Sequence, residues 1–285
     1  MSQPLKSASP LPPEALAHYE GGIELPRLAR ATGQLELVRT QELLTRYLPS
    51  PPAVLLDVGG GPGVYACWLA HQGYEVHLID AVPLHIEQAT RASQAQPKHP
   101  IASMAVGDAR KLERPAESAD AVLLFGPLYH LTDRHDRVTA LREACRVLRP
   151  GGVVCGVGIS RFASLMDGLV QGFLDDPDFV RIVERDLTDG QHRNPTNHPF
   201  YFTTAFLHDP ADLKAEMEEA GLSHRGTLGI EGPGWLLQNF AAHWENPGRR
   251  EHLLRAARTC EQQPSMLGLS AHLMAVGGKE EAETH

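Results

Sequence analysis

Short apolar runs alternate with longer amphipathic stretches along most of the chain. The run 53–58, bounded by Pro and Gly, is typical of a buried strand. The longer stretches repeat apolar residues three and four positions apart, which predicts helices. This alternation predicts an α/β fold with a doubly wound, mostly parallel, seven-stranded sheet. The strands are expected near residues 53–58, 74–80, 101–110, 119–125, 153–159, 222–234 and 267–279.

Two segments depart from this alternation. Residues 14–48 are expected to be helical and to end at the prolines that precede the first strand. Residues 160–208 predict two short amphipathic helices and a polar loop; because they follow a central strand, we expect them to cover the ligand-binding edge as a lid. Asp209 and Pro210 then have the residue types of a helix N-terminus, and Gly221 ends that helix. The expected divisions are an N-terminal helical cap (1–48), a ligand-binding core (49–159), the lid (160–208), the second half of the same α/β domain (209–278) and a disordered tail (279–285).

Composition and charge limit the classes of partner and the location that we expect for this chain. The net charge is -9 and no block of Lys and Arg occurs, which argues against nucleic acid and anionic membranes and favours a small-molecule partner. No apolar run is long enough to span a bilayer and no secretory signal is evident, so a cytoplasmic location is expected. The four cysteines are scattered along the chain, which favours reduced thiols over disulfides. Oligomeric state is not indicated.

The densest chemical signal is "LLDVGGGPGVYA", Leu55 to Ala66, directly after the first predicted strand. Glycine is this frequent where a backbone turns sharply or approaches a ligand closely. From Gly61, "GPGVYA" matches the G-x-G-x-x-G/A pattern of dinucleotide-binding loops, and Asp80 lies at the distance expected for a ribose-binding acid. A nicotinamide-dependent oxidoreductase is therefore one interpretation.

The wider context favours another ligand. Asp57-x-Gly59-x-Gly61-x-Gly63 resembles the first motif of the class I S-adenosylmethionine-dependent methyltransferases. Four later features occur in the order of that family: Asp80, "GDA" at Gly107–Ala109, "ADAVLLFGPLYHL", and "ACRVLRPGG". Carboxylates suit a sulfonium amino acid and would repel a pyrophosphate, so Asp57 is the residue that discriminates between the two ligands.

The resemblance implies roles for individual residues. It implies S-adenosylmethionine as the cofactor, S-adenosylhomocysteine as the product, and Asp80 on the ribose hydroxyls. It also implies Asp108 and Ala109 near the adenine, Phe125 at the end of the fourth strand, and an N-terminal aromatic, for which Tyr19 is the candidate, near the sulfonium. A non-catalytic S-adenosylmethionine-binding protein remains an alternative.

Candidate catalytic residues follow the fourth strand. His130 is the first candidate for a general base, because histidine accepts protons near neutral pH, and Tyr129 lies beside it. His192, His198 and His208 match no compact metal motif, so no metal is expected. The aromatic residues of the lid suggest an apolar acceptor, although such residues also serve as packing. The expected function is methyl transfer to a small-molecule acceptor by in-line displacement.

Overall fold

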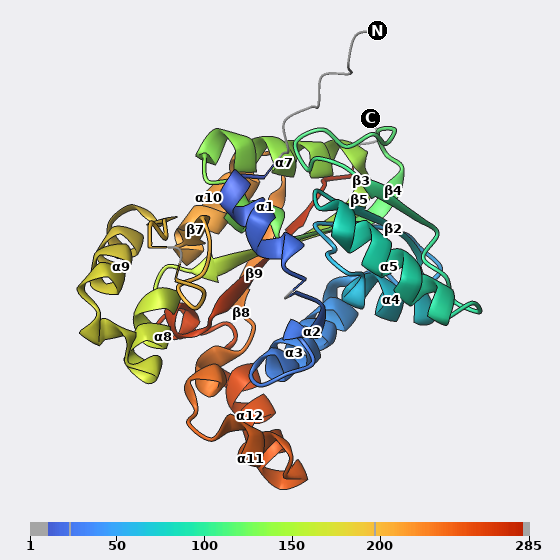
Figure 1. Cartoon of the computed structure of the whole chain (residues 1–285). Helices are drawn as coiled ribbons and strands as arrows, with labels where there is room; N and C mark the ends of the chain where they lie inside the picture. Colours follow the sequence, from blue (N-terminus) through green and yellow to red (C-terminus); the bar gives the residue numbers. More distant parts are fainter. Residues whose placement is uncertain (1–10, 23, 197, 282–285) are drawn as a thin grey trace, which may run out of the picture.

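The computed structural model describes residues 11–281, except residues 23 and 197. Most of the predicted tail, 279–285, lies outside the described residues. Figure 1 shows strands and helices alternating along the chain. The helices are α1 (Pro13–Glu20), α2 (Glu24–Arg27), α3 (Gly33–Tyr47), α4 (Val64–His71), α5 (Pro83–Ala95), α6 (Pro127–His130), α7 (Arg134–Val147), α8 (Ala163–Gln171), α9 (Pro177–Asp189), α10 (Pro210–Glu219), α11 (Phe240–Trp244) and α12 (Pro247–Cys260). The strands are β1 (Val54–Val58), β2 (Glu75–Asp80), β3 (Ser103–Val106), β4 (Ala119–Phe125), β5 (Leu148–Ser160), β6 (Gln191–His192), β7 (Ala205–His208), β8 (Ser223–Gly229) and β9 (His272–Gly278).

The predicted fold class is confirmed. Strands β3, β2, β1, β4 and β5 lie side by side and parallel, in that order. β9 pairs antiparallel with β5, and β8 antiparallel with β9. These seven strands are the predicted sheet. β6 and β7 are two further strands that the sequence analysis assigned to a loop.

The extra strand β7 extends the sheet beyond the end of β4. β4 pairs with β5 as far as Phe125 and Val157, and β7 then pairs with β5 at Ile159 and Ser160. Since β9 occupies the other edge of β5, β7 must take the edge that β4 leaves. The chain after β4 turns aside at Gly126 (φ 133°) into α6, which packs against β7.

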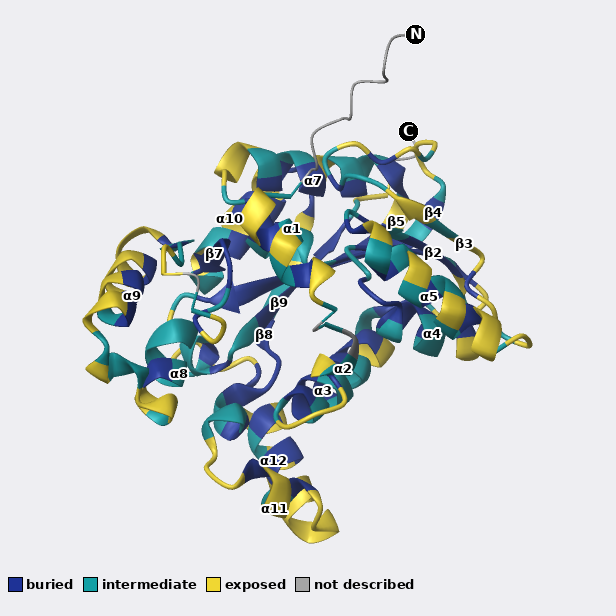
Figure 2. Ribbon diagram, in the orientation of Figure 1, coloured by how far each residue is buried: buried dark blue, intermediate teal, exposed yellow. Residues whose placement is uncertain are grey.

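Helices cover both faces of the sheet. Leu55 and Leu56 are neighbours in β1, so their side chains enter opposite faces. Leu55 packs in a cluster with Leu43 of α3 and Leu69 of α4, whereas Leu56 packs in a cluster with Leu141 of α7. Figure 2 shows the strands buried at the centre and the outer faces of the helices exposed. Two-sided burial is the reason that these strands appear in the sequence as unbroken apolar runs.

Two long helical segments are divided in the structure. Residues 14–48 form three helices because the backbone turns at Gly22 (φ 71°) and again at Ala31 (φ 45°). For the segment 236–260, where the apolar spacing predicts one helix, the structure has α11 and α12, since Asn246 caps a new helix that begins with Pro247. By contrast, the predicted cap at Asp209 is confirmed: its side chain accepts a hydrogen bond from the amide of Ala211.

The Pro150–Gly152 turn lies inside β5 and not at the end of the preceding helix. α7 ends at Val147, and β5 starts at Leu148. The pairing register with β4 shifts across this segment, where Gly151 has a φ of 79°. A bulge of this kind lets a strand pass through a turn-like sequence.

The insertion packs mainly on itself. Phe179, Ile182 and Val183 of α9 form a small cluster with Tyr201, and α8 and α9 lie at the left of Figure 1. α1 lies nearer the middle of the molecule, in front of the sheet. Within the described ranges, no helix has the length and apolarity needed to cross a membrane.

Candidate active site

A cavity of about 1040 Å³, its open mouth included, lies at the carboxyl ends of β1, β2 and β4. Its lining includes the glycine-rich loop, the strand ends and residues from the N-terminal helices. None of the described residues between 160 and 208 lines it. The cover that the structure shows is therefore the N-terminal segment, and the insertion lies beside the cavity.

The three predicted glycines have left-handed backbones. Their φ angles are 78° at Gly59, 55° at Gly61 and 85° at Gly63. A Cβ on Gly59 would lie 2.5 Å from Cδ of Pro127, so a side chain there would displace the turn after β4. Gly59 and Gly61 line the cavity; Gly63 does not, and instead lets α5 approach closely at Ala89.

Three amide groups of this loop are already used by the protein. The N–H of Gly59 donates to Ile79, that of Gly63 to Gly60, and that of Gly61 to Oδ2 of Asp80 at 2.8 Å. A pyrophosphate site requires free amide donors that point at the anion. The amides of the three motif glycines do not meet this requirement, and the loop lies against the carboxylate of Asp80.

Asp80 lines the cavity at the end of β2, as predicted. Its Oδ1 accepts hydrogen bonds from the amide of Val82 (2.8 Å) and from Nδ1 of His85 (3.0 Å). These contacts fix the carboxylate. His85 also lines the cavity, and its buried Nε2 has no hydrogen-bond partner among the described residues. No motif in the sequence singles out His85, although it follows Asp80 by only five residues.

Asp57 lies beneath the loop, outside the cavity lining. The side chain is fully buried, a Cβ on Gly60 would lie 2.7 Å from its Oδ2, and no hydrogen bond of normal geometry reaches either oxygen. Burial, and next the charge of Asp80, raise the pKa of Asp57 to about 7, against a smaller opposing effect of the Ala66 amide. Direct contact of Asp57 with a ligand remains a prediction; the structure places its carboxylate against the backbone of Gly60.

The other predicted cofactor residues line the same cavity. Asp108, Ala109 and Phe125 are all in the lining. Asp108 is bound by Arg110, whose Nη2 lies 2.7 Å from Oδ2. The ring of Phe125 meets that of Tyr65 edge to face at 5.4 Å between centroids. These residues form the wall next to β2 and β4.

His130 is paired with Tyr19. The Tyr19 hydroxyl lies 2.7 Å from Nε2 of His130, and Nδ1 of His130 lies 3.3 Å from the carbonyl oxygen of Thr204. Because a carbonyl only accepts, Nδ1 carries the proton and Nε2 accepts from Tyr19. Burial lowers the pKa of His130 to about 4, so the expectation of a histidine that titrates near neutral pH is wrong. Tyr129 does not line the cavity; its ring packs against His130.

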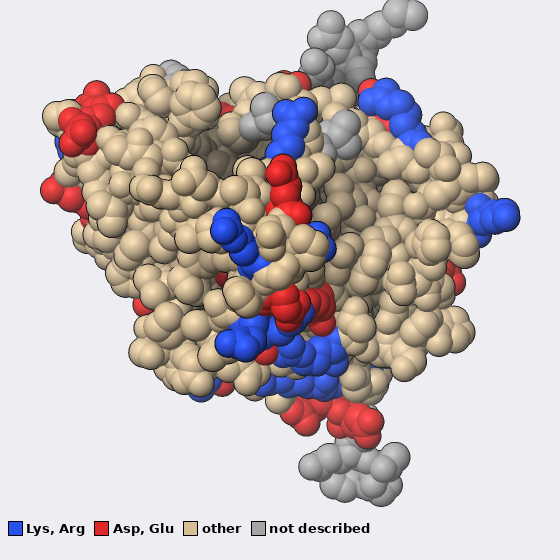
Figure 3. All heavy atoms as spheres, turned by 90° about the horizontal axis from the view of Figure 1, so that it is seen from below, with Lys and Arg blue, Asp and Glu red and all other residues tan. Residues whose placement is uncertain are grey.

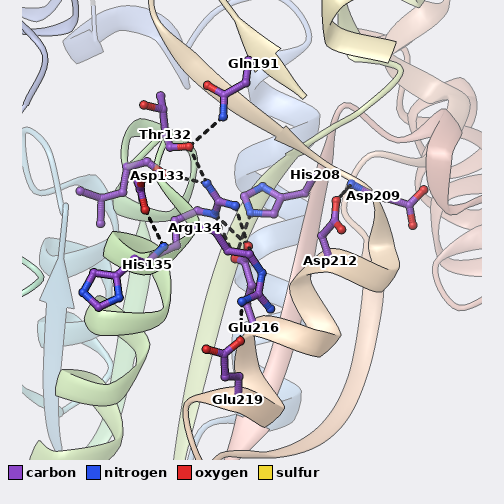
Figure 4. Close-up of polar contacts among 12 residues, drawn as sticks. Thr132, Asp133, Arg134, His135, Gln191, His208, Asp209, Asp212, Glu216 and Glu219 are labelled. Carbon is purple, nitrogen blue, oxygen red and sulfur yellow. Dashed lines mark hydrogen bonds and ion pairs between the residues drawn. The ribbon is translucent and has the colours of Figure 1, made fainter. Parts of the chain in front are cut away.

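A buried ion-pair network holds the segment that follows His130. The guanidinium of Arg137 binds Glu216 through Nε (3.0 Å) and Nη2 (2.7 Å), and its Nη1 donates to the carbonyls of Leu131 and Thr132. His208 lies 3.5 Å from Glu216. Figure 4 shows His208 of β7 and Glu216 of α10 pointing toward each other, with Gln191 bonded to Thr132. The network thus joins the cavity wall to the strands of the insertion.

The histidines of the insertion lie in separate environments. His192 bonds Asp186 and the carbonyl of Tyr201, and His198 stacks on Tyr201. The insertion's aromatic rings pack largely against one another, which removes the basis for inferring an apolar acceptor from them.

One group of described residues, Glu36, Glu231 and His272, is close enough to hold a metal ion. Hydrogen bonds already occupy it: Nδ1 of His272 donates to Glu231 at 2.6 Å, and Arg27 binds Glu36. Burial alone would lower the pKa of His272, but the charges of Glu36 and Glu231 raise it to about 9. A protonated imidazole between two carboxylates explains the group without a metal.

Surface charges are mixed on the face made by the lowest helices of Figure 1. Figure 3 shows Lys and Arg among Asp and Glu, not as an unbroken basic surface. Arg258 of α12 pairs with Glu42 of α3 at 2.6 Å, and Arg46 pairs with Glu261 at 2.5 Å. The exclusion of nucleic acid remains a prediction.

Known proteins share both sequence and fold with this chain. Residues 56–156 match a family model described as a methyltransferase domain. The chain is 28% identical over 184 residues to the S-adenosyl-L-methionine-dependent Diels-Alderase iccD of Talaromyces variabilis; the match covers 54% of this chain and 62%, less than two thirds, of that relative. It is 28% identical over 228 residues to the tRNA 5-carboxymethoxyuridine methyltransferase of Escherichia coli (strain K12), covering 78% of each. In fold, it resembles a SAM-dependent methyltransferase of Methanosarcina mazei with a TM-score of 0.58 and 17% identity, over 84% of this chain and 98% of that one.

The cavity suits a cationic cofactor. Glu24, Glu36, Asp80 and Asp108 line it, whereas Arg27 is the one Lys or Arg side chain in the lining among the described residues. Four carboxylates against one guanidinium, with the amides of Gly59, Gly61 and Gly63 already bonded, disfavour a dinucleotide and suit a sulfonium compound. Residues 56–156 match a methyltransferase domain and the chain has the fold of an S-adenosylmethionine-dependent methyltransferase, so the cofactor of this site is S-adenosylmethionine.

Proposed function

We propose that this protein transfers a methyl group from S-adenosylmethionine to a small-molecule acceptor. The observation that carries the proposal is the Tyr19–His130 hydrogen bond in the wall of the cofactor cavity. When bound, the cofactor supplies a methyl group that its positive sulfur has already activated. The remaining tasks of the protein are to align the acceptor, exclude water and hold the acceptor's O–H or N–H in a hydrogen bond.

The pair is suited to orienting an acceptor. Because the Tyr19 proton is directed at Nε2 of His130, the lone pairs of the Tyr19 oxygen remain free to accept an O–H or N–H from the acceptor. The lowered pKa of His130 keeps its ring neutral, so it continues to accept from Tyr19 at neutral pH. In this assignment Tyr19 contacts the acceptor and His130 positions Tyr19.

The N-terminal helices that cover the cavity support a small-molecule acceptor. Tyr19 and Glu24, from two N-terminal helices, stand over a cavity whose floor is the glycine-rich loop. A covered cavity favours a molecule that is enclosed together with the cofactor. The face seen in Figure 3 offers no unbroken basic surface for an RNA acceptor such as that named for the Escherichia coli relative.

The test is a labelling experiment with three readouts. The purified protein is incubated with S-adenosylmethionine carrying a radioactive methyl group, together with a metabolite extract or with total tRNA. Label in a low-mass product supports the proposal. Label in tRNA alone refutes the small-molecule acceptor, and no labelled product from a protein that still binds the cofactor favours a role without methyl transfer, as the name of the Diels-Alderase relative illustrates.

A further inference from the structure

Three charged residues form a clamp at the cavity, here called the Glu24–Arg27–Glu36 clamp. Arg27 donates from Nε to Glu24 at 2.9 Å, and from Nη1 and Nη2 to the two oxygens of Glu36 at 2.5 and 3.0 Å. All three residues line the cavity. The Arg27 side chain is 40% exposed and that of Glu36 11%, so a buried carboxylate holds a guanidinium that a ligand can still reach.

The clamp stands over the glycine-rich loop. Cγ of Glu24 lies 3.8 Å from the position that a Cβ on Gly61 would occupy. The Tyr129 hydroxyl, which feels the charges of Arg27 and Glu24, lies 3.8 Å from the corresponding position on Gly126. The clamp is therefore next to the two turns that follow β1 and β4.

The amino-acid end of the cofactor needs partners of both signs. It carries a carboxylate and an ammonium group, and the amides of the three motif glycines, Gly59, Gly61 and Gly63, are bonded within the protein. Arg27 is the single Lys or Arg side chain that the described lining offers. Glu24, bonded to it, has the opposite charge.

We infer that Arg27 binds the carboxylate of S-adenosylmethionine and that Glu24 binds its ammonium group. The zwitterion replaces the Arg27–Glu24 ion pair with two new ion pairs, so no charge loses its partner. Glu36 accepts one N–H from each terminal nitrogen of Arg27, so the second N–H of each nitrogen is available to bind the ligand carboxylate. Glu36 thereby keeps the guanidinium in place during the exchange, which reduces the entropy lost on binding.

Binding calorimetry with matched ligands tests the inference without any acceptor. The ligands are S-adenosylmethionine, decarboxylated S-adenosylmethionine, which lacks only the carboxylate, and 5′-methylthioadenosine, which lacks the whole amino-acid end. The variants are Arg27→Gln, Arg27→Lys and Glu24→Gln. Arg30→Gln, an exposed neighbour outside the cavity lining, is the control.

We expect Arg27→Gln to weaken S-adenosylmethionine by at least about tenfold and to abolish the preference over the decarboxylated ligand, since a charged hydrogen bond is lost. The affinity of Arg27→Lys for S-adenosylmethionine should lie between that of the wild type and that of Arg27→Gln. Glu24→Gln should weaken both amine-bearing ligands and leave 5′-methylthioadenosine within about twofold. Arg30→Gln should change nothing.

The ratio of two affinities in one variant is independent of how much of the sample is folded. If the preference for the carboxylate persists in Arg27→Gln, the inference is wrong. It is also wrong if Arg27→Gln weakens all three ligands equally, because Arg27 would then only hold the cover in place. Neither result bears on methyl transfer, which the labelling experiment tests separately.

Discussion

The hydroxyl of Tyr19 lies 2.7 Å from Nε2 of His130, a residue 111 positions further along the chain. This contact joins α1 to the turn after β4 and sets the orientation of both side chains. The backbone carbonyl of Thr204 fixes the tautomer of His130 from the other side. A residue from the N-terminus, one from the core and one from the insertion thus meet at one point of the cavity wall.

Removing either partner of this pair is expected to impair turnover more than cofactor binding. Tyr19→Phe and His130→Ala should each lower kcat by about 10- to 100-fold, because the acceptor loses its oriented hydrogen-bond partner. The dissociation constant of S-adenosylmethionine, measured by calorimetry, should change by less than about threefold. Tyr129→Phe is the control, since Tyr129 packs nearby but does not line the cavity; an equal loss in that variant would contradict the assignment.

Asp57 is expected to make stability depend on pH. Its folded pKa is raised to about 7 from 3.8, so the folded protein holds this proton more tightly than the unfolded chain does. The resulting cost to stability is absent below about pH 4 and grows as the pH rises to 7. Asp57→Asn cannot ionise and should therefore be more stable than the wild type. This advantage in the free energy of unfolding should be larger at pH 8 than at pH 5 by at least about 1.4 kcal/mol, the equivalent of one pKa unit.

Urea unfolding of the ligand-free protein at the two pH values measures this gain. Asp120→Asn is the control of opposite sign, because Arg149 lies 2.6 Å from Asp120 and lowers its pKa against the effect of burial. That variant should lose stability at pH 8. A gain for Asp57→Asn that does not change with pH would show that Asp57 is not a strained carboxylate.

The buried Arg137–Glu216 pair predicts non-additive stability effects. Both side chains are almost fully buried, so Arg137→Met or Glu216→Gln alone leaves a charge without a partner and should cost about 3–5 kcal/mol. The double variant Arg137→Met/Glu216→Gln should cost less than the sum of the two single changes. Unfolding in guanidinium chloride measures the free energy of unfolding of each variant. The exposed pair Arg181–Asp178 is the control, and removing either of its partners should cost less than about 1 kcal/mol. Additive costs would mean that the two charges do not depend on each other.

His272 should stabilise the fold at low pH and lose that effect at high pH. Its pKa is raised to about 9 by Glu36 and Glu231, which outweigh burial. The contribution is complete below about 6.5, the unfolded value, and is lost as the pH rises through 9. His272→Gln should therefore cost more stability at pH 6 than at pH 10 in chemical denaturation.

A proton titration of the His272 imidazole by NMR provides an independent check. In the denaturation experiment, the effect of His77→Gln on stability is expected to change with pH in the opposite direction, since burial lowers the pKa of His77. A His272 pKa near 6.5 would refute the ion-pair interpretation of this group.

The sequence alone determined the architecture and one wall of the cavity. Strands buried on both faces leave apolar runs, and a loop that needs positive φ at Gly59, Gly61 and Gly63 leaves glycines, so both signals are local. Asp80 and Asp108 follow strand ends, and parallel strands end at one edge of the sheet. The cap at Asp209 was predictable for the same local reason.

The tertiary structure alone decided which segment covers the cavity and what faces it. In the sequence, Glu24, Arg27 and Glu36 resemble the charges of any solvent-facing helix, and only the packing of the N-terminal helices brings them over the loop. The Tyr19–His130 hydrogen bond also depends on the tertiary structure, because it joins residues far apart in the sequence. So does the lowered pKa of His130, because distant segments bury this side chain. Hydrophobic periodicity encodes how a segment folds locally; contacts between segments far apart depend on the whole chain, and these contacts complete the site.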